Sequence, residues 1–213
     1  MAEASTAPPD QRVPESIQHS VLAEFAAGVC RDIAGGLLST TGDDLVPFLE
    51  REVGRLRQAL EDPFALGEGS EPRHPPVFDR RGRIAVATNP VVSHRNAIAP
   101  PMKLVRSGDE CEFTVELPLQ YQGPPSKLHG GYSAVLLDEA LWKAVRVNVS
   151  AISFTRELTI GYERPVPLFE PVTVLARVTE VDGRKTFAEG EILAGGEVCS
   201  RAHGLWISPR PRE

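Results

Sequence analysis

Asp138 is the carboxylate whose place in the sequence most favours chemistry. If residues 128–146 form a helix, Asp138 shares a face with the residues three and four positions away. Those neighbours are all apolar, and the charged residues of the segment fall on another stripe. A carboxylate on an apolar face is costly to desolvate, and such groups often mark functional sites. The apolar neighbours are Ala134, Val135, Leu141 and Trp142.

The beginning of the same helix is suited to holding an oxyanion. The first N–H groups of a helix have no partner within it and lie at the positive end of the helix dipole. Gly130 and Gly131 leave the backbone there open to a substrate carbonyl. His129 precedes them, and the sequence shows no partner that would fix its tautomer, so both a structural and a catalytic role stay open.

Other catalytic and cofactor motifs are missing from the sequence. Ser133 follows Gly131 without the second glycine of a G-x-S-x-G elbow, so it is a weak nucleophile and a candidate substrate contact instead. Neither of the common glycine-rich phosphate loops occurs, and the remaining histidines lack metal-ligand spacing. We therefore expect no metal and no cofactor. These histidines are His19, His74, His94 and His203.

The motif His129-Gly130-Gly131, with Asp138 nine residues after the histidine, resembles the hotdog-fold thioesterases of the PaaI type. The similarity covers about residues 96–207. It implies an α+β fold in which an antiparallel sheet wraps a long central helix. It also implies an oxyanion N–H at Gly130, with Gly131 close behind, and a histidine that shapes the turn and contacts the thioester.

The resemblance extends to the residues around Asp138. Thr155 lies nine residues before Arg164 of an Arg-Pro pair, where related enzymes place a hydroxyl near the attacking water. The alternative for Thr155 is a β-branched residue that fits a pleated surface. For Asp138 the alternative is a buried acid satisfied by backbone groups or by an ion pair with Arg156. Trp142 is a candidate substrate contact, together with Gly131 and Ser133.

The function implied is hydrolysis of acyl-CoA or aryl-CoA thioesters to the free acid and coenzyme A. Asp138 would act as general base or as nucleophile. The active site would lie between two subunits of a homodimer or homotetramer. The alternative is a non-catalytic hotdog dimer that binds acyl-CoA or has a regulatory role. A hotdog hydratase or dehydratase fits less well, because Lys143 stands where that pattern requires a histidine. The acyl chain and the choice between coenzyme A and an acyl-carrier protein stay open.

The elements needed to position this site follow from periodicity. Strands are expected at residues 102–106 and 112–117 before the helix. After it, residues 151–162 alternate, with Phe154 and Leu158 on an apolar face, Thr155 on the polar face, and only Arg156 breaking the pattern. Three further strands are expected at 172–181, 185–193 and 197–207, joined by Asp182-Gly183 and Gly195-Gly196 turns.

Residues 1–95 precede this hotdog domain, which we place at 96–213. Residues 1–15 are rich in proline, alanine and acids and are expected to be disordered. Two amphipathic helices follow, the first from Ile17 to about Gly35-Gly36 and the second over Leu45–Leu60, forming a hairpin that must pack on something else. A linker is expected at 67–83, and a short strand within 84–92 that Pro90 interrupts.

The bulk properties are those of an ordinary globular protein. The 213 residues carry a formal net charge of −6, which disfavours nucleic acid and acidic membranes as partners. Three scattered cysteines, Cys30, Cys111 and Cys199, indicate reduced thiols rather than a disulfide framework. Without a leader-like N-terminus or a long apolar run, the protein is expected to be cytoplasmic.

Overall fold

The computed structural model describes residues 15–61, 89–106, 110–148 and 153–210. The chain divides into two compact units, one formed by Met1–Asn89 with Ser93–Ala97 and the other by Pro90–Val92 with Ile98–Glu213. The expected N-terminal tail before residue 15 and the linker at 67–83 lie outside the described residues. The short strand expected before Pro90 falls on residues 84–89, of which 84–88 lie outside the described residues, and residues 90–92 form a turn.

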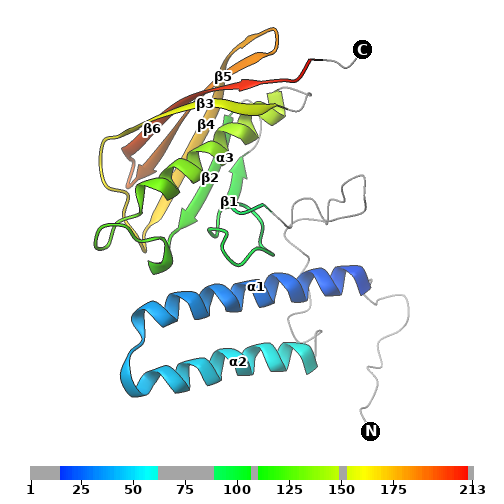
Figure 1. The fold of residues 1–213 in the computed structure, drawn as a ribbon, viewed down its shortest axis with the longest axis vertical. Coiled ribbons are helices and arrows are strands. Elements are labelled where there is room, and N and C mark those ends of the chain that lie inside the picture. The colour runs from blue at the N-terminus through cyan, green and yellow to red at the C-terminus, as the bar shows by residue number, and fades with distance from the viewer. Residues whose placement is uncertain (1–14, 62–88, 107–109, 149–152, 211–213) are drawn as a thin grey trace. The chain divides into compact units, whose positions relative to one another are not determined.

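The first unit is a helical hairpin of α1 (Glu15–Ser39) and α2 (Leu45–Glu61), joined by a short 3₁₀ helix at Gly42–Asp44 (Figure 1). The expected end of the first helix was wrong, because α1 continues through Gly35 and Gly36. Gly36 lies against the ring of Phe48, and a Cβ added at Gly36 would come within 1.9 Å of that ring. Close packing of the two helices therefore requires the glycine inside α1, where sequence alone indicates a helix end.

An ion cluster around the buried Glu52 joins the two helices of the hairpin. Glu52 is 3% exposed and accepts bonds from Arg51 at 3.0 Å and from Arg55 at 2.5 Å. Arg55 also reaches Asp32 of α1 at 2.8 Å, which connects the two helices. Burial raises the pKa of the Glu52 carboxyl, but the hydrogen bonds from Arg55 and Arg51 outweigh burial and bring that pKa below its ordinary value.

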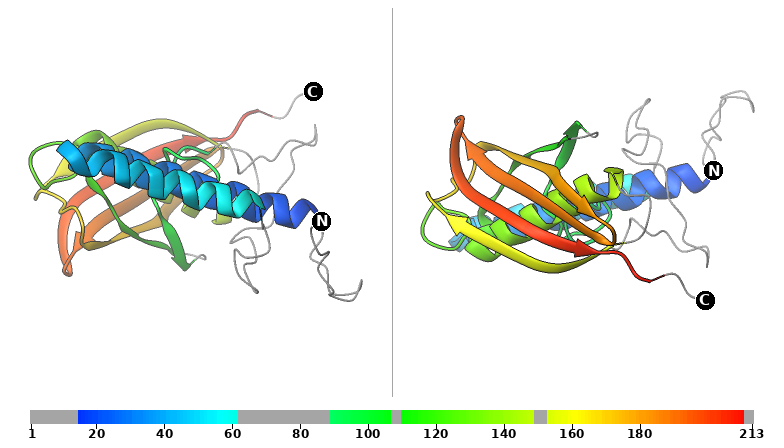
Figure 2. Two further views of the ribbon diagram at one scale, coloured as in Figure 1. Left: turned by 90° about the horizontal axis from the view of Figure 1, so that it is seen from below. Right: turned by 90° about the horizontal axis from the view of Figure 1, so that it is seen from above.

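The second unit is one six-stranded antiparallel sheet that curves around the long helix α3 (Gly130–Asn148), as Figures 1 and 2 show. The hotdog arrangement expected from the sequence is confirmed. The strand order is β1-β2-β4-β5-β6-β3, so β3 lies at one end of the sheet. The strands are β1 (Lys103–Arg106), β2 (Glu110–Glu116), β3 (Phe154–Tyr162), β4 (Pro171–Asp182), β5 (Lys185–Ala194) and β6 (Glu197–Ile207).

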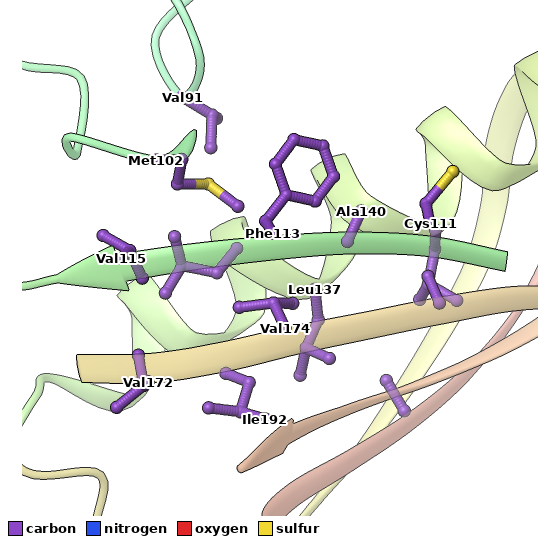
Figure 3. Close-up of a cluster of buried hydrophobic side chains, with 14 of the residues drawn as sticks. Val91, Met102, Cys111, Phe113, Val115, Leu137, Ala140, Val172, Val174 and Ile192 are labelled. Atoms are coloured by element: carbon purple, nitrogen blue, oxygen red, sulfur yellow. The ribbon is translucent and has the colours of Figure 1, made fainter. Parts of the chain in front are cut away.

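The core of this unit lies between α3 and the inner face of the sheet. Leu137 and Ala140 of α3 lie near Phe113 of β2 and Val174 of β4 in this core (Figure 3). Each fully buried leucine or phenylalanine contributes about 1.5–3 kcal/mol. A Cβ at Gly190 of β5 would lie 2.6 Å from a backbone oxygen and 3.3 Å from Leu141, so this glycine lets the helix approach the sheet closely. The helix therefore has a fixed position on the sheet.

None of the helices in the described part of the chain is long and apolar enough to cross a membrane.

Candidate active site

Asp138 and Thr155 meet where α3 passes the edge strand β3. The Thr155 hydroxyl donates to Asp138 Oδ1 at 3.0 Å. Asp138 is half-buried, because its helical neighbours Val135 and Trp142 are turned partly outward, whereas the sheet-facing residues of α3 are fully buried. Arg156 forms no ion pair with Asp138 among the described residues. The carboxylate thus has one hydroxyl donor and access to solvent.

A β-bulge at Arg156 places Thr155 on this face. Thr155 pairs with Trp206 and Glu157 with Leu205, which leaves Arg156 as an extra residue in β3. Opposite residues of an antiparallel pair share a face, and Trp206 is fully buried under the helix. The prediction that Thr155 lies on the face opposite Leu158 was therefore wrong. Strict alternation fails at Arg156, the residue that interrupted the apolar pattern.

The same bulge turns Phe154 away from the helix. Phe154 pairs with Ile207 in the register next to Thr155 and is 63% exposed. Leu158 pairs with Gly204 and therefore shares the face of Thr155. Phe154, expected on the apolar face with Leu158, lies on the opposite face of the sheet.

His129 caps the beginning of α3. Its Nδ1 accepts a hydrogen bond from the Gly131 N–H at 3.0 Å, and its carbonyl accepts from the N–H groups of Tyr132 and Ser133. An N–H donor at Nδ1 requires the lone pair there, so a neutral imidazole carries its proton on Nε2. The sequence showed no partner that would fix the tautomer of His129, and the structure identifies it as the backbone N–H of Gly131. This contact is a capping interaction and leaves Nδ1 unavailable as a base.

The first turn of α3 presents one open N–H group. Gly131 is engaged by His129, whereas the Gly130 N–H has no hydrogen-bond partner among the described residues. The Gly130 carbonyl accepts a hydrogen bond from the Tyr162 hydroxyl at 3.1 Å. The Gly130–Gly131 peptide is therefore held at both ends, its carbonyl by Tyr162 and its N–H by His129. This arrangement favours Gly130 over Gly131 as a donor to an incoming oxyanion.

Tyr162 is the residue at this site that sequence reasoning missed. Alternation makes Tyr162 only the last apolar position of the run at 151–162, yet it is 57% exposed and reaches the helix with its hydroxyl. The signal in the sequence was a tyrosine at the end of an alternating run, because a phenol gains from a polar partner. With Thr155, it gives β3 two hydroxyl contacts along α3.

The other two candidate substrate contacts lie in different settings. Ser133 is 2% exposed and belongs to the sheet-facing side of α3. The structure therefore does not bring it to the surface that carries Asp138. Trp142 is half-buried, packs against the core and lies one helical turn after Asp138. Of these two, only Trp142 borders the carboxylate.

Arg164 and Arg201 are both paired with glutamates. Arg164 forms an ion pair with Glu197, and the hydrogen bond with that carboxylate raises the pKa of Arg164. Arg201 contacts Glu163 at 2.8 Å and also pairs with Glu191. Neither guanidinium is an uncompensated positive charge. Within the described residues, no cluster of three histidine, cysteine or acidic side chains could hold a metal ion.

The family comparison matches residues 126–200 to the model of the Thioesterase superfamily, so the match includes the His129 turn, Asp138 and Thr155. The crystal structure of protein RHA08564, a thioesterase superfamily protein, is 32% identical. It aligns with 87% of this chain and 94% of its own, with a TM-score of 0.64.

Curated relatives share the same region. Acyl-coenzyme A thioesterase THEM4 of Bos taurus is 34% identical over 94 residues, which are 43% of this chain and 38% of the relative. THEM4 of Mus musculus is 36% identical over 101 residues, 45% of this chain and 41% of the relative. The chain thus spans about two fifths of the length of these relatives.

Proposed function

Because the chain belongs to the thioesterase superfamily, we propose that it hydrolyses acyl-CoA thioesters to a carboxylic acid and free coenzyme A. The observation that carries the proposal is the half-buried Asp138 carboxylate, which accepts a hydrogen bond from Thr155 on the face that borders Trp142. The activity named for the THEM4 relatives supports this substrate class.

Each residue has a defined part in the proposed reaction. Asp138 takes a proton from water, or attacks the thioester carbonyl itself, while Thr155 holds one carboxylate oxygen and leaves the other for the reacting group. The Gly130 N–H donates to the carbonyl oxygen as negative charge develops there. On the base route, the water oxygen forms the new C–O bond, the C–S bond breaks, and the leaving thiolate receives the proton that Asp138 took from water. On the nucleophile route, Asp138 forms the C–O bond as the C–S bond breaks, and water then hydrolyses the acyl–Asp138 anhydride, which frees the acid and supplies the proton to the thiolate. His129 and Tyr162 hold the turn that presents Gly130.

The geometry favours a site shared between two subunits. Gly130 and Asp138 are eight residues apart on one helix, a rise of about 12 Å. A thioester carbonyl needs both its oxyanion donor and its attacking group at about 3 Å, which one copy of α3 does not provide. We propose that Gly130 of one subunit acts with Asp138 of another. Of the two edge strands of the sheet, β3 carries Thr155 and Tyr162 at the site, so we propose β3 as the element that pairs.

The proposal is tested by thiol release from a panel of short, long and aryl acyl-CoAs, with an acyl-carrier-protein thioester included. Asp138→Asn removes the base and is expected to lower kcat by at least about 100-fold. Glu139→Gln, at the neighbouring position of the same helix, is the matched control. An Asp138→Asn variant that is folded and fully active would exclude this mechanism. Tight CoA-ester binding without turnover by the wild type would indicate the binding module instead.

A further inference from the structure

Helix α2 has two distinct faces, and only one of them packs on α1. The α1-facing side carries Phe48 against Gly36, together with Glu52 and Arg55, the latter bonded to Asp32 of α1. Glu52 and Ala59, one helical heptad apart, are its buried residues. The contacts between α1 and α2 described above all involve this face of α2.

The second face is an apolar stripe with heptad spacing. Its members follow one another at intervals of three, four, three and four residues, which places them on one side of a helix as the a and d positions of a coiled coil. Val46, Val53 and Leu60, at the a positions, are 62%, 49% and 68% exposed. The d positions are half-buried. We call this set the α2 stripe: Val46, Leu49, Val53, Leu56 and Leu60.

Two exposed, opposite charges flank the α2 stripe along one edge. Glu50 and Arg57 are seven residues apart, so both occupy the e position of the heptad. Neither has an ion-pair or hydrogen-bond partner among the described residues, whereas four other charged residues of the hairpin are joined in one ion cluster, namely Asp32, Arg51, Glu52 and Arg55. A charged residue pair of this kind at the border of an apolar seam sets partner choice and orientation.

We propose that the α2 stripe binds the α2 stripe of a second copy of this chain in antiparallel orientation. In an antiparallel pair the e positions of the two helices face one another, so Glu50 of each copy meets Arg57 of the other. The register that brings these charges together packs Leu60 against Leu49 of the second copy and Val53 against Leu56.

The parallel arrangement is disfavoured by the ion cluster inside the hairpin. In a parallel pair Arg57 would face position g of the second copy, which is Glu52. That carboxylate is 3% exposed and already accepts bonds from Arg51 and Arg55. It is not available to Arg57, and Glu50 would face the apolar Leu45. Only the antiparallel pair satisfies both flanking charges.

Disulfide trapping in the full-length protein tests the orientation directly. All variants carry Cys30→Ser, because Cys30 is the exposed cysteine, and keep the buried Cys111 and Cys199. The double variant Leu49→Cys/Leu60→Cys is oxidised, and the linked peptides are identified by mass spectrometry. The expected product is a dimer joined between positions 49 and 60. The two positions are eleven residues apart on one helix, about 16 Å, too far for a bond within one chain.

Controls separate the alternatives. Gln58→Cys, on an exposed position away from both faces, should give no disulfide-linked dimer. Bonds between identical positions, 49 to 49 and 60 to 60, would show a parallel pair and overturn the proposal. If no disulfide-linked dimer forms although circular dichroism shows unchanged helix content, the chain itself covers the stripe. That outcome would also overturn the proposal. An equimolar mixture of the single variants Val53→Cys and Leu56→Cys, which excludes a bond within one chain, gives the same test at positions nearer the centre should the first variant misfold.

Charge reversal provides a second test with the same readout. Glu50→Arg or Arg57→Glu alone places like charges opposite one another and should slow dimer trapping about fivefold, the effect of about 1 kcal/mol. The combination of both substitutions restores opposite charges and should restore the wild-type rate. Additive slowing in the double variant would exclude the Glu50–Arg57 contact.

Discussion

Thr155 Oγ1 lies 3.0 Å from Asp138 Oδ1, so a strand at the edge of the sheet orients a carboxylate on the central helix. A hydroxyl that donates to one carboxylate oxygen fixes the plane of the group and leaves its second oxygen for a reactant. The contact crosses between elements 17 residues apart in sequence. It therefore depends on the fold, and it can be removed without altering either element.

Thr155→Val keeps the shape of the side chain and removes its donor. We expect kcat for acyl-CoA hydrolysis to fall at least about tenfold, because a hydrogen bond to a charged group contributes about 1.5–3 kcal/mol. Thr155→Ser should retain most of the activity. Thr159→Val is the control, because Thr159 is exposed on the same strand but pairs with His203 on the opposite face. Equal kcat for the two valine variants would argue against a role for Thr155.

Tyr162→Phe removes the hydroxyl that holds the Gly130 carbonyl. We expect kcat to fall several-fold with KM and thermal stability nearly unchanged, because the ring stays in place and the hydroxyl is exposed. Tyr121→Phe provides the contrast, since the Tyr121 hydroxyl donates to the Ile98 carbonyl from within the core. That change should lower the melting temperature and leave kcat intact. A Tyr162 variant that loses stability instead of kcat would show a purely structural role.

Glu52 makes the helical hairpin sensitive to acid. Its folded-state pKa lies below the ordinary value of 4.5, so its contribution to the unfolding free energy is complete above pH 4.5. The contribution is lost as the pH falls through the pKa that Glu52 has in the folded state. Glu52→Gln should lower stability at neutral pH and flatten this acid limb, measured by denaturant unfolding followed by circular dichroism. Glu61→Gln, an exposed position on the same helix, should leave the acid limb unchanged.

Two glycines of α1 should respond oppositely to the same substitution. Gly36→Ala places a methyl group within the Phe48 ring and should destabilise the hairpin by about 1–3 kcal/mol. Gly28→Ala meets only Arg31 at 3.8 Å, an ordinary contact, and should stabilise the helix by about 0.5–1 kcal/mol. Adding Phe48→Leu to Gly36→Ala should recover part of the loss. A stabilising Gly36→Ala would contradict the packing of α1 on α2.

Local patterns in the sequence were sufficient for much of the fold. Strand β6 begins and ends where alternation placed it, at Glu197 and Ile207. The turns at Gly183 and Gly195 have φ of 57° and 58°, the left-handed region that glycine adopts without strain. Asp138 was found because a helix repeats every three to four residues, and its face follows from spacing alone. These features depend on residues close together in the chain.

The errors arose where a distant contact decides the local structure. Nothing near Gly36 in sequence reports that Phe48 will lie against it, so two glycines indicated a helix end. Tyr162 and Gly130 are 32 residues apart, and their hydrogen bond exists only after β3 has joined the sheet beside α3. Alternation in twos cannot place Thr155 either, because an unpaired residue in the strand changes the count.

The bulge at Arg156 shifts the alternation of side chains along β3 by one residue. From Glu157 to Tyr162 the even-numbered residues face the helix, whereas before the bulge the odd-numbered Thr155 faces the helix and Phe154 faces away. Deleting Arg156 would remove the extra residue and leave both pairings in place, with Thr155 opposite Trp206 on the helix side and Phe154 outward. Closing the bulge with Arg156 kept in the ladder would instead turn Phe154 toward the helix and the hydroxyl of Thr155 outward, so the hydrogen bond to Asp138 depends on the bulge. Relatives of this chain that differ in length at this position should therefore be aligned by the pairing of their strands rather than by residue count.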